Sequence, residues 1–180
     1  MKKLLILLGC LTILSLFAYL FLIHGKSSES ETVAKIENVL LPIVIENKII
    51  AYIDTDWCQA IHYGDRIVQR LKDPDSNSYC LDNSQAFASD DETIFNKIRD
   101  SIVENDLNIN RISYEYPLRY RQEHESLPET SFGISFSLNC AFCGVRYLYA
   151  TNTIEFINID REISYTRVNN KWYIVNQDPL

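Results

Sequence analysis

The chain has 180 residues, of which 47% are hydrophobic and 12% aromatic. This is enough apolar material for a packed core, so the composition excludes an intrinsically disordered protein. There are 17 basic and 24 acidic residues in total, and Lys2 and Lys3 precede an uncharged run, so residues 24–180 carry a net charge of −9. Because so acidic a domain repels phosphate, we predict that it does not bind nucleic acid.

An uncharged apolar run occupies residues 4–23. A helix of this length spans about 30 Å, the thickness of the bilayer hydrocarbon. Lysines precede the run and glutamates follow it, so the positive-inside rule places residues 1–3 in the cytoplasm. We therefore predict a single-pass signal anchor in the cell membrane, a linker over residues 24–30, and an extracytoplasmic domain over residues 31–180. The short Met-Lys-Lys start is typical of bacterial envelope proteins.

Two other interpretations of this run are weaker. A cleaved signal peptide needs a shorter apolar region and an A-x-A-like site, and neither is present. Leu7–Cys10 resembles a lipobox, but a lipobox cysteine ends the apolar stretch, whereas 13 mostly apolar residues follow Cys10. We expect Cys10 to be a small buried hydrophobe.

The first half of the outer domain gives mixed signals. A capping box at residues 28–31 predicts a helix over 29–40 that Pro42 stops. Residues 43–45 and 49–53 fit either a hairpin or an apolar helix. Thr55 is positioned to cap a short helix through Trp57, Ala60 and Ile61 that Gly64 ends. Residues 66–72 and 78–81 flank a Pro- and Asp-rich turn, which predicts a hairpin.

The second half is clearer. A capping box at residues 89–92 opens an amphipathic helix that runs to Glu104. Beyond it hydrophobic residues alternate over 112–116, 132–138 and 145–149, which predicts half-buried strands. Asn169 and Asn170 predict a type I′ hairpin between strands 162–168 and 171–175. The fold class is α+β: helices packed on an antiparallel sheet of four or more strands, cystatin-like or NTF2-like in outline. That likeness of shape implies no activity.

Four cysteines lie in the outer domain, where an oxidising compartment permits disulfides. They allow three pairings, of which we favour Cys58 with Cys80 and Cys140 with Cys143. The Cys-Ala-Phe-Cys segment also fits two other interpretations, an envelope thiol–disulfide oxidoreductase and a small structural zinc domain. The first needs a lowered thiol pKa and the second needs four ligands, and the sequence offers neither around it.

The remaining polar motifs favour structural roles. Asp54 and Asp56 suggest an acidic metal pair, but helix capping through Thr55 is the better explanation. His62 and His124 have no partner at metal-ligand spacing, and no hydrolase or phosphate-loop motif occurs. We assign no catalytic residue, metal or cofactor.

One segment is rich in the residues that dominate protein interfaces. Residues 114–121 contain five of them: Tyr114, Tyr116, Arg119, Tyr120 and Arg121. The simpler interpretation is a strand end whose arginines neutralise an acidic domain. We expect a membrane-tethered, non-catalytic binding module for a protein partner in the cell envelope.

Overall fold

A computed structural model describes residues 29–72, 80–115, 133–139, 144–150 and 163–177. The chain divides into two compact units, residues 1–34 and 35–180. Of the first unit only residues 29–34 are described, and they are helical. No helix in the described ranges combines the length and apolar character needed to cross a bilayer. The predicted anchor, residues 4–23, lies outside these ranges.

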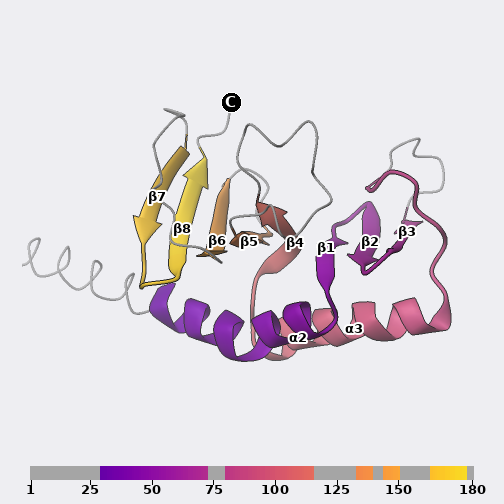
Figure 1. The fold of residues 1–180 in the computed structure, drawn as a ribbon, viewed down its shortest axis with the longest axis horizontal. Helices are drawn as coiled ribbons and strands as arrows, with labels where there is room; N and C mark the ends of the chain where they lie inside the picture. The colour runs from indigo at the N-terminus through magenta and orange to yellow at the C-terminus, as the bar shows by residue number, and fades with distance from the viewer. Residues whose placement is uncertain (1–28, 73–79, 116–132, 140–143, 151–162, 178–180) are drawn as a thin grey trace, which may run out of the picture. The chain divides into compact units, whose positions relative to one another are not determined.

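The second unit is an α+β domain built on an eight-stranded antiparallel sheet, which confirms the predicted class (Figure 1). The strand order is β3-β2-β1-β4-β5-β6-β8-β7. The strands are β1 (Ile49–Asp54), β2 (Cys58–Tyr63), β3 (Arg66–Leu71), β4 (Ile109–Glu115), β5 (Gly133–Leu138), β6 (Val145–Ala150), β7 (Ile163–Arg167) and β8 (Trp172–Gln177). Helix α3 (Ser89–Glu104) joins β3 to β4 along the chain.

Helical structure continues past the proline that the sequence predicts to end it. The π-helix η1 (Ile36–Leu40) leads into α2 (Leu41–Glu46), and Pro42 lies at the beginning of α2. The Leu41 N–H donates to the carbonyl of Ile36, five residues earlier. A proline ring clashes with the carbonyl four residues before it in an α-helix, and the wider π turn gives the ring room. The predicted end at Leu40 is therefore wrong.

Helix α3 has the predicted range, but its cap is shifted by one residue. Ala88 is the N-cap residue, and its N–H donates to the Asp91 carboxylate at 2.8 Å. The sequence pattern predicts Ser89 as the cap, with Glu92 as the returning acid. The carboxylate of Asp91 is fully buried and also accepts hydrogen bonds from Arg66 Nε (2.9 Å) and Arg66 Nη2 (2.7 Å). Because Arg66 lies on β3, this strand determines that Asp91, and not Glu92, faces inward.

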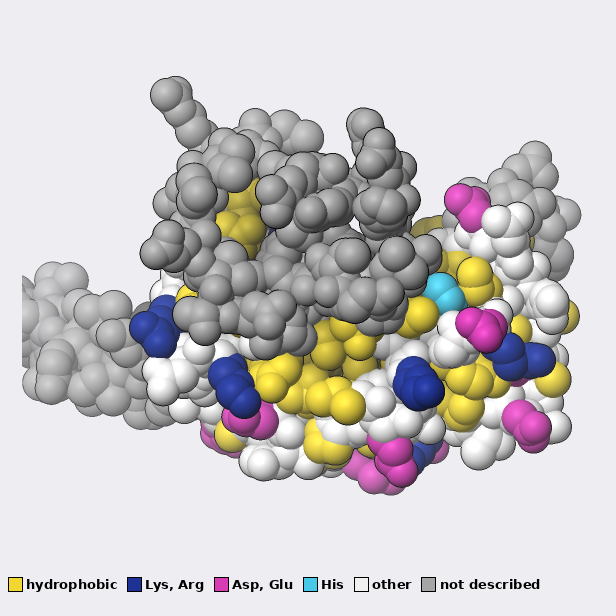
Figure 2. All heavy atoms as spheres, in the orientation of Figure 1, with side chains coloured by type: hydrophobic (Ala, Val, Ile, Leu, Met, Phe, Trp, Pro, Cys, Tyr) yellow, Lys and Arg dark blue, Asp and Glu magenta, His cyan; other side chains and the backbone are white. Residues whose placement is uncertain are grey.

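The helices cover one face of the sheet, which we call the helix face (Figure 1). Across all eight strands one row of this face consists of Val68, Ile61, Tyr52, Ile112, Phe136, Tyr147, Ile174 and Thr166. Every member of the row up to Ile174 is buried, and Phe95 of α3 packs on Tyr52 with ring centroids 4.9 Å apart. Charged side chains of both signs lie on the outer side of the helices (Figure 2). This row is therefore the centre of the core.

The domain contains the same motif twice, a helix followed by three antiparallel strands. Helix α2 precedes β1–β3 and helix α3 precedes β4–β6. Strand β1 of the first motif pairs antiparallel with β4 of the second. Each helix ends on an asparagine, Asn47 or Asn105, whose side chain donates to a carbonyl four residues earlier. A positive-φ residue, Lys48 or Asp106, follows each asparagine. The β1–β2 and β4–β5 pairings both contain a register shift near the start of the first strand.

Three predicted local structures are wrong. Residues 58–63 form a strand and not the helix expected after Thr55. Cys80 and Leu81 belong to no strand, so the predicted partner strand of β3 does not form there; residues 73–79 lie outside the described ranges. The β7–β8 hairpin exists, but neither Asn169 nor Asn170 has positive φ. Instead, Asn169 Oδ1 accepts the N–H groups of residues 171 and 172, so a side chain closes the turn.

Candidate functional site

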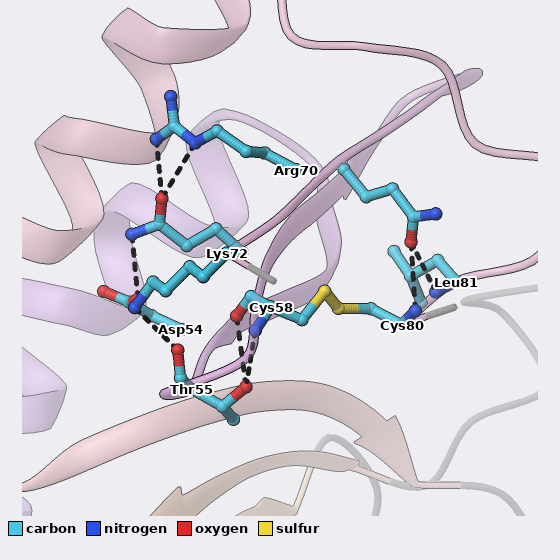
Figure 3. The surroundings of a disulfide bond; sticks show 9 residues. Asp54, Thr55, Cys58, Arg70, Lys72, Cys80 and Leu81 are labelled. Carbon is cyan, nitrogen blue, oxygen red and sulfur yellow. Dashed lines mark hydrogen bonds and ion pairs between the residues drawn. A yellow bond between two sulfur atoms is a disulfide. The ribbon is translucent and has the colours of Figure 1, made fainter. Parts of the chain in front are cut away.

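The disulfide between Cys58 and Cys80 confirms the first predicted pairing. The two Cα atoms are 6.3 Å apart and the residues are 22 apart in the sequence. Cys58 is fully buried and Cys80 half-buried. The side-chain oxygen of Gln69 in β3 accepts the N–H groups of Cys80 (3.0 Å) and Leu81 (3.3 Å), as Figure 3 shows. The bridge and these hydrogen bonds fix the segment after β3 to the sheet.

The three-residue turn between β1 and β2, residues 55–57, is held from several sides (Figure 3). Thr55 Oγ1 accepts the Cys58 N–H at 3.2 Å and donates to the Cys58 carbonyl at 3.1 Å, and the Thr55 N–H also donates to that carbonyl. Lys72 Nζ donates to the Thr55 carbonyl at 2.6 Å, and the Lys72 N–H donates to the Trp57 carbonyl at 2.9 Å. Together with the disulfide, these bonds make the turn rigid.

Two side chains point into solvent from this turn, Asp56 and Trp57. Trp57 is 40% exposed, whereas Trp172, the other tryptophan, is fully buried. Within the described ranges no hydrogen bond or ion pair reaches the Asp56 carboxylate. An exposed tryptophan on a rigid turn is typical of a binding hot spot, because tryptophan is among the residues enriched there. Sequence reasoning missed it because the spacing assigns Trp57 to the buried side of a helix.

Asp54 differs from Asp56 because its carboxylate has partners among the described residues. It accepts hydrogen bonds from Lys72 Nζ at 3.2 Å and from Gln59 Nε2 at 3.0 Å. Burial raises the pKa of the neighbouring Tyr52 hydroxyl, and the negative charge of Asp54 raises it further. Asp54 therefore has a structural role. Thr55 stabilises the turn before β2 and does not cap a helix. In the part of the chain that the structure describes, no three His, Cys, Asp or Glu residues are placed to hold a metal.

A second polar arrangement lies on the sheet face opposite the helices. It runs over β4, β5 and β6, and we call it the polar strip. By register its members share that face; they are Arg111, Ser113, Glu115, Ser135, Ser137 and Arg146.

One ion pair crosses this strip. Arg146 Nε lies 2.9 Å from Glu115 Oε1, and the two side chains are only 14% and 13% exposed. The pair joins β6 to β4 across β5 and so passes over the row that contains Ser135. Ser135 is 1% exposed, and its hydroxyl has no hydrogen-bond partner among the described residues. The pair therefore fixes the centre of the strip, while Arg111 at its edge is exposed.

The predicted partner surface at residues 114–121 is only partly described. Tyr114 ends up half-buried on the helix face, and burial raises the pKa of its hydroxyl. Tyr116, Arg119, Tyr120 and Arg121 lie outside the described residues. The structure therefore places Tyr114 away from the polar strip and leaves the proposed surface as a prediction.

The other residues singled out from the sequence are two cysteines and two histidines. Cys140 and Cys143 lie outside the described ranges, between β5 and β6 in the chain, so their predicted bridge is untested. His62 lies on β2, where partial burial lowers the pKa of its imidazole. His124 is also outside the described ranges.

Comparisons with known proteins give no relative. No protein-family model matches the chain, and neither curated proteins nor solved structures include a significant match. The likeness to cystatin-like or NTF2-like folds therefore stays a prediction, and function has to be argued from the residues themselves.

Proposed function

We propose that this chain is a non-catalytic binding module. A membrane helix at residues 4–23 tethers it and displays it outside the cytoplasm, where it captures a protein partner of the cell envelope. The observation that carries the proposal is the β1–β2 turn, which holds Trp57 40% exposed on a backbone fixed by hydrogen bonds and a disulfide.

Rigidity is what makes this turn suited to binding. An aromatic side chain on a flexible loop loses conformational entropy when a partner orders it, and that loss weakens binding. Here the backbone on both sides of Trp57 is already ordered, because Thr55 and Cys58 bond to each other and Lys72 bonds to the turn. Most of the ordering cost is therefore met during folding.

The disulfide supports the proposed compartment. Structural disulfides are rare in the reducing cytoplasm and common outside it. The positive-inside rule places the domain on the same side of the membrane. A reporter enzyme that is active only outside the cytoplasm, fused after Leu180, tests this directly: the fusion should be active, and activity only of a cytoplasmic reporter would contradict the placement.

Site-specific photocrosslinking in membranes tests partner capture. A photoreactive phenylalanine analogue placed at position 57 of the full chain should form a discrete adduct with another protein. The same analogue at Val103, which is 71% exposed on α3, is the matched control. Equal adducts at both positions, or none at 57, would overturn the proposal.

A further inference from the structure

We propose that the partner presents a basic segment, and that Trp57 and Asp56 together receive a lysine or arginine side chain from it. This inference rests on the proposed binding role and adds the chemistry of the partner. Its basis is the local balance of charge around the β1–β2 turn.

Of the described cations, Lys72 and Arg70 lie near the turn, and both are already paired with carboxylates. Lys72 Nζ lies 3.2 Å from the Asp54 carboxylate and 2.6 Å from the Thr55 carbonyl. Arg70 Nη1 lies 2.7 Å from Glu92, and its other nitrogens donate to the side-chain oxygen of Gln59. Neither reaches Asp56. Among the described residues no cation contacts the exposed Asp56 carboxylate, which is therefore open to a cation from a partner.

Indole and carboxylate favour the same ligand group. A cation over an indole face gains an electrostatic attraction from the ring, and a carboxylate next to it supplies a charged hydrogen-bond acceptor. Apolar contact alone would favour any hydrophobic partner. The Asp56 carboxylate, which no described residue pairs, disfavours a partner that buries it without a counterion. A lysine or arginine side chain satisfies both groups at once.

The charge of the whole domain acts in the same direction. Residues 24–180 carry a net charge of −9. Such a field raises the association rate of a basic segment and repels acidic surfaces, including anionic lipid. A basic peptide is thus drawn to the domain before it contacts the turn.

A peptide titration tests the inference. The full chain is reconstituted in phosphatidylcholine nanodiscs, and a hexa-arginine peptide is added. The chain has two tryptophans, and Trp172 is fully buried, so a change in the solvent-exposed emission component reports on Trp57. We expect saturable binding that weakens as salt rises, and no binding of a hexa-glutamate peptide.

Variants locate the binding site. Trp57→Ala should weaken binding of hexa-arginine, measured by calorimetry, by about tenfold or more. Trp57→Phe should retain part of the affinity, and Asp56→Asn should lower both the affinity and its salt dependence. Val103→Ala, which removes an exposed hydrophobic side chain elsewhere, should leave binding unchanged.

The outcomes separate this inference from the binding role. Equal binding of hexa-arginine to the Trp57→Ala variant, or no binding of hexa-arginine to the wild-type chain, would each overturn the basic-segment proposal. A crosslinked partner at position 57 together with no binding of hexa-arginine would keep the binding role and reject a basic partner. Loss of both would reject the two proposals together.

Discussion

Replacing Asp91 with asparagine should destabilise the domain far more than the same change at its neighbour. The Asp91 carboxylate is fully buried. It accepts hydrogen bonds from the Ala88 N–H, from Nε and Nη2 of Arg66 and from the Tyr63 hydroxyl. These partners, Arg66 foremost, lower its pKa from 3.8 to about 2. An asparagine has no charge and turns a hydrogen-bond donor toward groups that donate.

The magnitude follows from the pKa. The lowering of this pKa from 3.8 to about 2 corresponds to roughly 2–3 kcal/mol of stability at neutral pH. Arg66 is 49% exposed, and solvent screening reduces its share of this energy. Asp91→Asn should therefore lower the free energy of unfolding by about 2 kcal/mol at pH 7. Asp90→Asn, an exposed residue in the same first helical turn, should cost only about 0.3–1 kcal/mol.

The pH dependence has a definite sign. The pKa of Asp91 is lower in the folded state, so the unfolded chain takes up the proton first, and acid removes the stabilisation. The difference between wild type and Asp91→Asn should be complete above about pH 5 and mostly lost near pH 2. Urea unfolding of the full chain, followed by the emission of the buried Trp172, measures it at each pH. Equal losses for the two asparagine variants at pH 7, or a difference unchanged at pH 2, would refute the reasoning.

Three further changes test other parts of the structure. Gly144 and Gly64 have similar φ values, +50° and +51°, but a Cβ added at Gly144 would meet the Gln177 carbonyl, whereas a Cβ at Gly64 would enter open space. Gly64→Ala should lower the free energy of unfolding by about 1 kcal/mol, and Gly144→Ala should lower it, and the urea midpoint, by clearly more. Cys58→Ser should destabilise the domain by about 3 kcal/mol through lost loop closure, and thiol titration of the denatured wild-type protein should give at least two more free thiols with reductant than without. Glu115→Gln should lower the free energy of unfolding by about 1–3 kcal/mol because it leaves the largely buried Arg146 guanidinium without its ion pair. Adding Arg146→Met should recover part of the loss. Purely additive effects in this double-mutant cycle would show that the two side chains do not couple.

Part of the candidate site could be predicted and part could not. The Cys58–Cys80 bridge is predictable because few pairings are possible and the predicted compartment permits disulfides. The β1–β2 turn is not predictable in this way, because Trp57, Ala60 and Ile61 have helical spacing although they belong to a turn and a strand. Short segments with apolar residues on both faces carry no distinct period, and β2 is buried on both faces over its first four residues.

By itself the sequence determined the elements whose periodicity is strong: α3, the alternating strands β4 to β6, and the β7–β8 hairpin. It also determined the acidic charge of the domain and the disulfide pair. Only the tertiary structure decided that the helix continues through Pro42, that Asp91 caps α3, and that Glu115 meets Arg146 across β5. The physical reason is that sequence patterns report on one element at a time. The roles of Asp91 and Glu115 depend on residues of other strands that face them, and the helix through Pro42 depends on a change from π-helical to α-helical pitch.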